Sequence, residues 1–245
     1  MTNFSPTGGQ TTKADAGPRD TGFIAALLVL SVSTGILDGV SYHALDEVFT
    51  GNMTGNVLSL GFSLGGQHQL PVVNLLVALV VFFLGAVTAA RVLRFRKTSD
   101  RVPLATTATL ACGTIATLST GVWWATTGSL TDTEVVLVTG VLAFFLGAQA
   151  STLKPVGIRD ISTVVVTMTL VNLAHDGWLA GKHDPHWLRK LLAILAIGVG
   201  AFIGTALYFS FGAPVATCAA AAVMGSGVVV LRVVSNHVAR KASLN

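Results

Sequence analysis

Six long apolar runs, nearly free of charged residues, set the strongest constraint on how this chain can fold. An α-helix needs about 20 apolar residues to cross the hydrocarbon core of a bilayer. A helix is also the one kind of secondary structure in which a single segment can pair all of its own backbone groups in lipid. We therefore predict an all-α, polytopic transmembrane helix bundle with about six spans, at residues 21–40, 71–90, 103–125, 134–152, 191–211 and 214–234.

The composition agrees with this class. Charged residues make up 11% of the chain and hydrophobic residues 52%, whereas about a quarter of a soluble domain is charged. Such a chain cannot cover a water-facing surface, so the lipid bilayer is its expected partner. Residues 1–21 are polar and lack apolar periodicity, which predicts a disordered tail. A single transmembrane domain at 22–235 and a short second tail at 236–245 follow it.

The basic residues predict the orientation. With six spans, all 15 Lys and Arg residues fall on one side, in the N-terminal tail, the second and fourth loops and the C-terminal end. Lys and Arg accumulate in cytoplasmic loops, so we predict that both termini are cytoplasmic. The net charge of +4 then reflects topology, and we expect no nucleic-acid partner. The opposite side carries Asp46, Glu47, Asp132 and Glu134.

Two segments between spans, 41–70 and 154–190, are too long and too apolar for plain loops. Within them, residues 57–64 and 161–174 are apolar but are too short or too polar for full spans. A full crossing at either place would also leave basic loops outside. We therefore predict two short helices, which are re-entrant or interfacial.

A weak internal repeat connects these segments. Shifting the sequence by 113 positions brings three pairs into register, and each segment follows a span that ends in a Gly-containing turn (Gly35 and Gly147). The chain then divides into two units, 22–127 and 134–234, and an odd number of spans in each inverts the second. Chance similarity between small-residue segments is the alternative. The pairs are Thr50 with Thr163, Thr54 with Thr167, and Leu60 with Leu173.

Asp38 is the first candidate for chemistry, because a carboxylate at membrane depth is costly and usually functional. It lies near the end of the first span. If ionised, it can hold a cation or a substrate amine, and if protonated by burial, it can exchange a proton during transport. A place in the headgroup layer, or a purely structural hydrogen bond, is the alternative.

The stretch from Thr50 to Asn56 supplies hydroxyls, amides and glycines without charge. It can line a polar cavity, or simply form a turn and cap a short helix. Together with the second unit, it gives the predicted substrate or ion pathway. The residues of this pathway are Asp38, Tyr42, Asn52, Thr54, Asn56, Gln149, Thr163, Thr167 and Asn172.

The remaining motifs give weaker evidence of function. The run His183-Asp-Pro-His186 has metal-binding residue types, but it lacks a third ligand, and a solvated loop explains it better. Cys112 and Cys218 lie in apolar runs and form no ligand set, so we expect no metal and no cofactor. The motif Gly200-Ala-Phe-Ile-Gly204 predicts a close helix contact, within the chain or in a homo-oligomer.

The chain resembles the YoaK-type family of bacterial inner-membrane proteins. The resemblance rests on Gly35-x-x-Asp38-x-x-Ser41-Tyr42 and on Met53-Thr54-Gly55-Asn56, followed in the second unit by Gly147-x-Gln149, Asp160-x-x-Thr163 and Thr167. It implies a multi-pass protein of the bacterial inner membrane, in a family whose activity is uncharacterised. Two departures are Gly39, where members often have Ala, and Met168, where Gly is common.

Three functions compete at this point. A small secondary transporter or permease fits the polar residues at corresponding places in two units. A membrane scaffold or regulatory subunit would use the same residues for packing and its basic face for a partner or anionic lipid. An intramembrane enzyme needs a catalytic constellation, for which only Asp38 with Tyr42 or His43 offers a start, so we expect no enzyme. The solute or ion is not specified by the sequence.

Overall fold

The computed structural model describes residues 18–67, 70–94, 102–156, 166–176 and 187–242. In these ranges the regular structure is entirely helical, as predicted. The elements are α1 (Pro18–Ala44), α2 (Met53–Leu64), α3 (Val72–Arg94), α4 (Leu104–Thr127), α5 (Asp132–Leu153), the 3-10 turn η1 (Lys154–Val156), α6 (Val166–Asp176), α7 (Trp187–Phe211) and α8 (Ala213–Ala242).

Five helices in the described ranges are long and apolar enough to cross a membrane: Thr21–Ala44, Val72–Arg94, Asp132–Leu153, Trp187–Phe211 and Ala213–Lys241. The remaining long helix, α4, has 24 residues and is rich in threonine. Most of its threonine hydroxyls donate to carbonyl groups one turn back, as from Thr109 to Ala105 and from Thr117 to Gly113, and Thr107 is an exception. Because these polar groups are satisfied inside the helix, α4 is compatible with lipid, and the sixth span stays a prediction.

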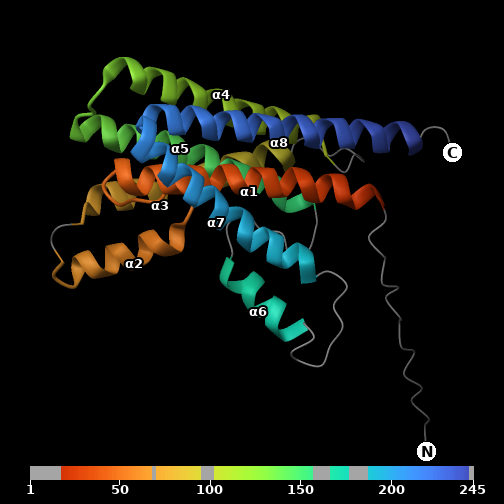
Figure 1. Ribbon diagram of the computed structural model, residues 1–245, viewed down its shortest axis with the longest axis horizontal. Coiled ribbons are helices and arrows are strands. Elements are labelled where there is room, and N and C mark those ends of the chain that lie inside the picture. The colour runs from red at the N-terminus through yellow and green to blue at the C-terminus, as the bar shows by residue number, and fades with distance from the viewer. Residues whose placement is uncertain (1–17, 68–69, 95–101, 157–165, 177–186, 243–245) are drawn as a thin grey trace, which may run out of the picture.

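The order of elements repeats along the chain, with one long helix, one short helix and two long helices in each half. The short helices α2 and α6 begin 113 positions apart, at Met53 and Val166, which is the register of the weak sequence repeat. In Figure 1, α1 and α5 run in opposite directions along the long axis. There α2 and α6 both begin near the middle of that axis and run toward opposite ends. These directions are those that the predicted inverted repeat requires.

Glycines bring α1 and α7 into backbone contact. A methyl group on Gly35 would overlap the carbonyl oxygen of Ile197, and one on Gly200 would overlap that of Val32. Each glycine thus faces a carbonyl group on the other helix, and that carbonyl lies three residues before the contacting glycine of that helix. Such close approach is available only to residues without a side chain. Gly204, which faces the Ile36 carbonyl, confirms the helix contact predicted from the GxxxG motif.

The same arrangement joins α3 to α5. A methyl group on Gly85 would overlap the Phe144 carbonyl, and one on Gly147 would overlap the Phe82 carbonyl. Again each glycine faces the carbonyl three residues before its partner glycine. The interpretation of Gly35 and Gly147 as turn residues was wrong, because both lie inside helices, where they are the contact points of two equivalent helix pairs.

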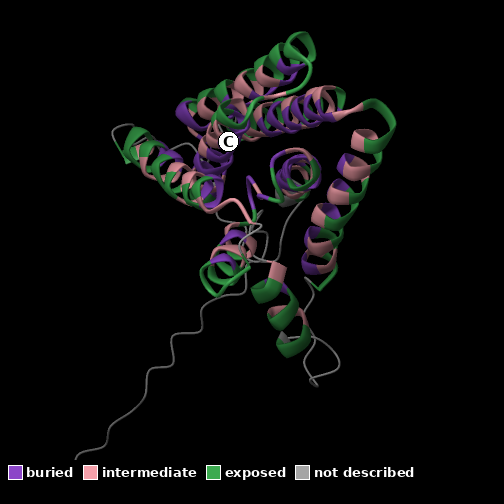
Figure 2. Ribbon diagram, turned by 90° about the vertical axis from the view of Figure 1, so that its left-hand side faces the viewer, coloured by how far each residue is buried: buried purple, intermediate pink, exposed green. Residues whose placement is uncertain are grey.

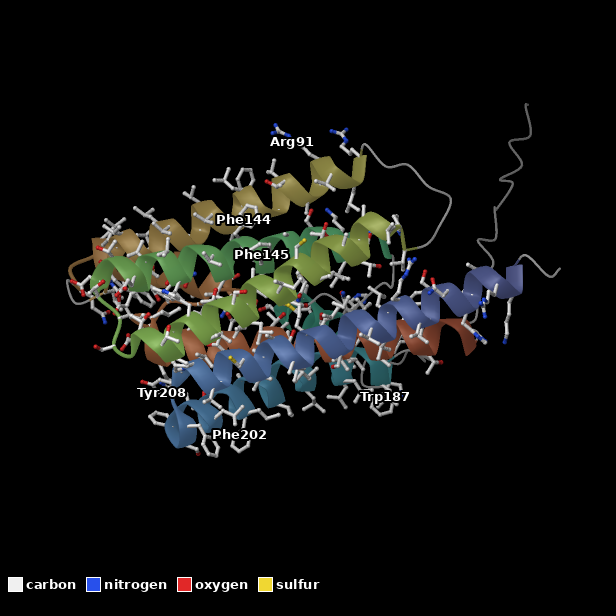
Figure 3. The ribbon with its side chains drawn as sticks, turned by 90° about the horizontal axis from the view of Figure 1, so that it is seen from above. Arg91, Phe144, Phe145, Trp187, Phe202 and Tyr208 are labelled. Carbon is white, nitrogen blue, oxygen red and sulfur yellow. The ribbon has the colours of Figure 1, made fainter. Side chains whose placement is uncertain are left out.

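Burial follows the same symmetry. In the most apolar 18-residue window of each helix, the share that is buried is 72% in α1 and 56% in α5. It is only 28% in α3 and 22% in α7. Figure 2 looks along the bundle, with buried residues inside and exposed ones on the outer faces. Figure 3 shows Trp187 and Phe202 projecting from the outer edge of α7, where they are 51% and 75% exposed. The two central helices are the equivalent first helices of the units, and the outer ones face lipid.

Two predicted boundaries differ from the structure. Helix α1 begins at Pro18, inside the predicted N-terminal tail, and proline is favoured at the first helical position because its missing N–H is not needed there. Helix α8 continues to Ala242, through most of the predicted C-terminal tail. Both extensions are polar and therefore fall outside the apolar runs from which the spans were predicted.

Candidate functional site

The chain turns back into the bundle directly after α1. Asp46 and Glu47 have φ angles of 58° and 59°, a left-handed conformation that reverses the backbone and is uncommon outside glycine. The loop then returns far enough for the Gly51 N–H to donate to Oδ1 of Asp38, at 2.6 Å. Asp38 lies six residues before Ala44, the last residue of α1, which is about 9 Å along the helix. The loop from 45 to 52 is therefore re-entrant.

Backbone donors surround the Asp38 carboxylate. The side chain is 8% exposed, and the N–H groups of Asn52 and Thr50 face it together with that of Gly51. The Thr50 hydroxyl also faces it but lacks hydrogen-bond geometry to any group. In the described part of the chain, the groups acting on Asp38 include no cationic side chain. Three peptide dipoles thus take the place of a counter-ion.

These donors form the start of α2. The helix begins at Met53, and the Asn52 side chain caps it by accepting from the Gly55 N–H at 3.2 Å. The amino end of a helix carries a partial positive charge that favours an anion, and Asp38 supplies that anion from α1. A Cβ on Gly51 would lie 3.2 Å from both carboxylate oxygens and 3.0 Å from Cγ2 of Thr34, so the backbone approaches the acid closely because this residue is glycine.

A second buried bond joins this site to the other unit. Nε2 of Gln149 in α5 donates to the Thr34 hydroxyl in α1 at 3.0 Å, one helical turn before Asp38. Gln149 is 3% exposed, Thr34 3% and Thr50 0%. Oε1 of Gln149 and Oγ1 of Thr50 are buried without a hydrogen-bond partner. We refer to Thr34, Asp38, Thr50, Gly51 and Gln149 as the Asp38 site.

Asn56 holds the re-entrant loop in shape. Its Oδ1 accepts from the Phe49 N–H at 2.9 Å, and its Nδ2 donates to the Phe49 carbonyl at 2.7 Å. The side chain is completely buried. Both polar atoms are engaged within the loop, so in this conformation Asn56 positions the backbone that faces Asp38.

Asn56→Ala is therefore expected to lower the free energy of unfolding by about 1–3 kcal/mol, because two partly buried backbone groups of Phe49 lose their partners. Thr54→Ala is the control, since this neighbouring side chain is exposed and should change stability little. Thermal unfolding of the two purified variants in detergent measures the difference. Equal melting temperatures would show that Asn56 does not hold the loop.

The other predicted pathway residues are more scattered. Tyr42 is exposed and stacks on Phe49, with ring centroids 5.1 Å apart. Thr54 and Thr167 are exposed near the first turns of α2 and α6, and Thr163 lies outside the described residues. The structure thus brings together Asp38, Asn52 and Gln149 from the predicted set, and a direct role for the others stays a prediction.

Lys190 was not among the predicted site residues. It is 1% exposed in the first turn of α7, and its Nζ donates to the Asn172 carbonyl of α6 at 3.3 Å. A cation is stabilised near the carboxyl end of a helix. The two short helices are thus held by buried charges of opposite sign, Asp38 at the amino end of α2 and Lys190 toward the carboxyl end of α6. In the sequence, only the position of Lys190 beside the apolar run of α7 could have indicated its burial.

No group of three or more His, Cys, Asp or Glu residues lies close enough to hold a metal ion within the described ranges. His183 and His186 lie outside those ranges. The expectation of no metal or cofactor stays a prediction. The Asp38 site contains one carboxylate, backbone N–H donors and neutral side-chain oxygens.

These features define a multi-pass helical membrane protein with a buried polar site. The chain belongs to the family described as "Protein of unknown function (DUF1275)", whose model matches residues 26–231. It is similar to the UPF0700 transmembrane protein YoaK of Bacillus subtilis (strain 168), with 32% identity over 187 residues, which cover 72% of this chain and 80% of that protein. No solved structure matches. The predicted YoaK-type family is confirmed.

Proposed function

We propose that the protein is a small secondary transporter or permease whose solute or ion pathway passes the Asp38 site. The observation that carries this proposal is a buried carboxylate, held by a re-entrant loop, beside the Gln149–Thr34 bond between inverted units. Transporters built from inverted repeats bind their cargo near mid-membrane, at the unit interface, and often at the ends of broken helices. The start of α2 is such an end.

Orientation and location are part of the proposal. The described basic side chains cluster where α3 ends, α5 ends, α7 begins and α8 ends. In Figure 1 these points lie toward the end of the bundle where α1 begins and α8 ends. Lys and Arg favour the cytoplasmic side. We place this end in the cytoplasm and the protein in the bacterial inner membrane.

A membrane scaffold is the second candidate. It is favoured by the hydrogen bond from Gly51 to Asp38, since a carboxylate that fixes a loop needs no solute to explain its place within the bundle. The two candidates differ in what happens when the charge is removed and the bond is kept. A scaffold would tolerate the neutral amide, whereas a transporter that uses the charge would not.

Solute uptake into vesicles reconstituted with the purified protein separates them. A panel of labelled small anions, cations and neutral solutes serves as the probe. We expect uptake of one class by the wild type and its loss in Asp38→Asn. Asp46→Asn is the control, because it removes a carboxylate that is exposed in the same loop. Uptake that is equal in wild type and Asp38→Asn, or no uptake of any class, would contradict the proposal.

A further inference from the structure

The Asp38 site contains an arrangement suited to an acid that gains and loses a proton. In the charged form, the carboxylate accepts from the Gly51 N–H and faces those of Thr50 and Asn52. In the protonated form, one oxygen becomes an O–H donor and the other still accepts. That new donor needs an acceptor inside the bundle, because an unpaired buried donor is costly.

Such an acceptor is already present. Oγ1 of Thr50 is buried without a partner and faces the Asp38 carboxyl group. Buried polar oxygens without partners are rare in proteins and call for an explanation. A second one, Oε1 of Gln149, lies on the residue that bonds Thr34 one turn away. The site thus has spare acceptors beside the acid.

We propose that Asp38 is a proton-binding site that is hydrogen-bonded in both protonation states, by backbone N–H groups and the facing Thr50 hydroxyl when charged, and by the oxygen of that hydroxyl as an acceptor when neutral. Resting on the function proposed above, we infer that the proton is the coupling ion of the transporter. One proton from water adds to a carboxylate oxygen, which becomes neutral, and the same proton leaves to water when the charged form is restored.

The surroundings favour a proton over a metal ion. A cation such as Na⁺ needs several oxygen ligands at once, whereas the Asp38 oxygens are faced by N–H donors, which repel a cation. A proton needs only one of those oxygens. Gly51 can keep its bond to the other, so the re-entrant loop need not unfold when the charge is lost.

Charged groups of the neighbouring helices do not face Asp38 in the described residues. Beside it, α5 presents Gln149, and α7 presents Ala201 and Thr205 next to Gly39. On α8, Val234 packs on Gly22, about 24 Å along α1 from Asp38, so the charges that follow it are distant. The remaining charged or titratable side chains nearby lie toward the outer end of α1. They are the exposed Tyr42, His43, Asp46 and Glu47, and Tyr208 of α7, which stacks on His43.

Infrared difference spectroscopy of the reconstituted full chain tests this inference without a transport assay. Titration from alkaline to acidic pH should develop the C=O band of a carboxylic acid that shifts in D₂O and is absent from Asp38→Asn. Thr50→Val removes the hydroxyl that faces the carboxyl group in both of its forms, so the position of the band and the pH at which half of it appears should differ from those of the wild type. Thr50→Ser keeps the hydroxyl and should titrate as the wild type does.

Absence of the band at every pH, or a Thr50→Val titration identical to that of the wild type, would overturn the inference. A band that disappears on adding Na⁺ at constant pH would overturn it in favour of a metal ion. The outcome is separable from that of the uptake assay. Titration without uptake leaves a proton site in a protein that does not transport, and Asp38-dependent uptake without titration leaves a transporter with another coupling ion.

Discussion

Leucine in place of Gly200 is expected to leave no folded, monodisperse protein in detergent, whereas leucine in place of Gly198 should leave the protein intact. Gly200 faces the backbone of α1 at Val32 and Gly35, and a Cβ on Gly198 would meet nothing within 4 Å. Overpacking typically costs about 1–3 kcal/mol and occasionally more. Here the obstacle is a backbone carbonyl, which cannot rotate away, so α1 and α7 would have to separate.

Size-exclusion chromatography and thermal unfolding of the detergent-extracted protein measure this effect, with Gly198→Leu as the matched control on the same helix. A parallel pair on α5 tests the equivalence of the units. Gly147→Ala should be destabilising, whereas Gly140→Ala should be tolerated, because its Cβ would meet only Cγ1 of Val77, at 3.5 Å. Equal behaviour within either pair would contradict the close helix contact it tests.

Removing the acceptor at Asp38 is expected to have the second large effect. Asp38→Leu leaves the Gly51 N–H without a partner at a depth where water is scarce, and the loss of one hydrogen bond to a charged group costs about 1.5–3 kcal/mol. The N–H groups of Asn52 and Thr50 lose the same carboxylate, so the total loss should exceed that of one bond. Asp38→Asn keeps one carbonyl oxygen to accept from Gly51, and its stability should stay close to that of the wild type.

The two variants separate a structural role from a functional one. Thermal unfolding should rank wild type and Asp38→Asn together, with Asp38→Leu far below, while vesicle uptake should be lost in both variants. If Asp38→Asn unfolds as easily as Asp38→Leu, the charge itself holds the loop. If Asp38→Leu is as stable as the wild type, the backbone donors of the loop do not depend on this side chain.

Much of the fold follows from hydropathy, because lipid imposes a minimum length on each span and requires helical backbone. This argument placed the long helices and weighed against full crossings at residues 50–66 and 161–180. It could not place Gly35 and Gly147 correctly. A glycine in a turn and a glycine in a helix contact look alike in one sequence, and only the partner helix distinguishes them.

The site was predictable in part. The cost of a carboxylate in lipid singled out Asp38, and Gln149 belongs to a motif that carried the family resemblance. Thr34 was missed because one threonine in an apolar span carries no signal, and its partner lies 115 positions away. The role of Gly51 was missed because it depends on a backbone N–H, which every residue other than proline possesses. Lys190 was assigned to a basic loop, since its burial depends on the placement of α6.

The inverted arrangement of the two units is the central claim, and site-specific cysteine labelling tests it most directly. In a chain with Cys112 and Cys218 replaced by alanine, single cysteines are placed at Gln67, after α2, and at Ala174, near the end of α6, both of which are exposed. A membrane-impermeant maleimide is added to intact cells and to opened membranes. Gln67→Cys should react in intact cells, and Ala174→Cys only after the membranes are opened. Labelling of both from the same side would contradict the inverted arrangement.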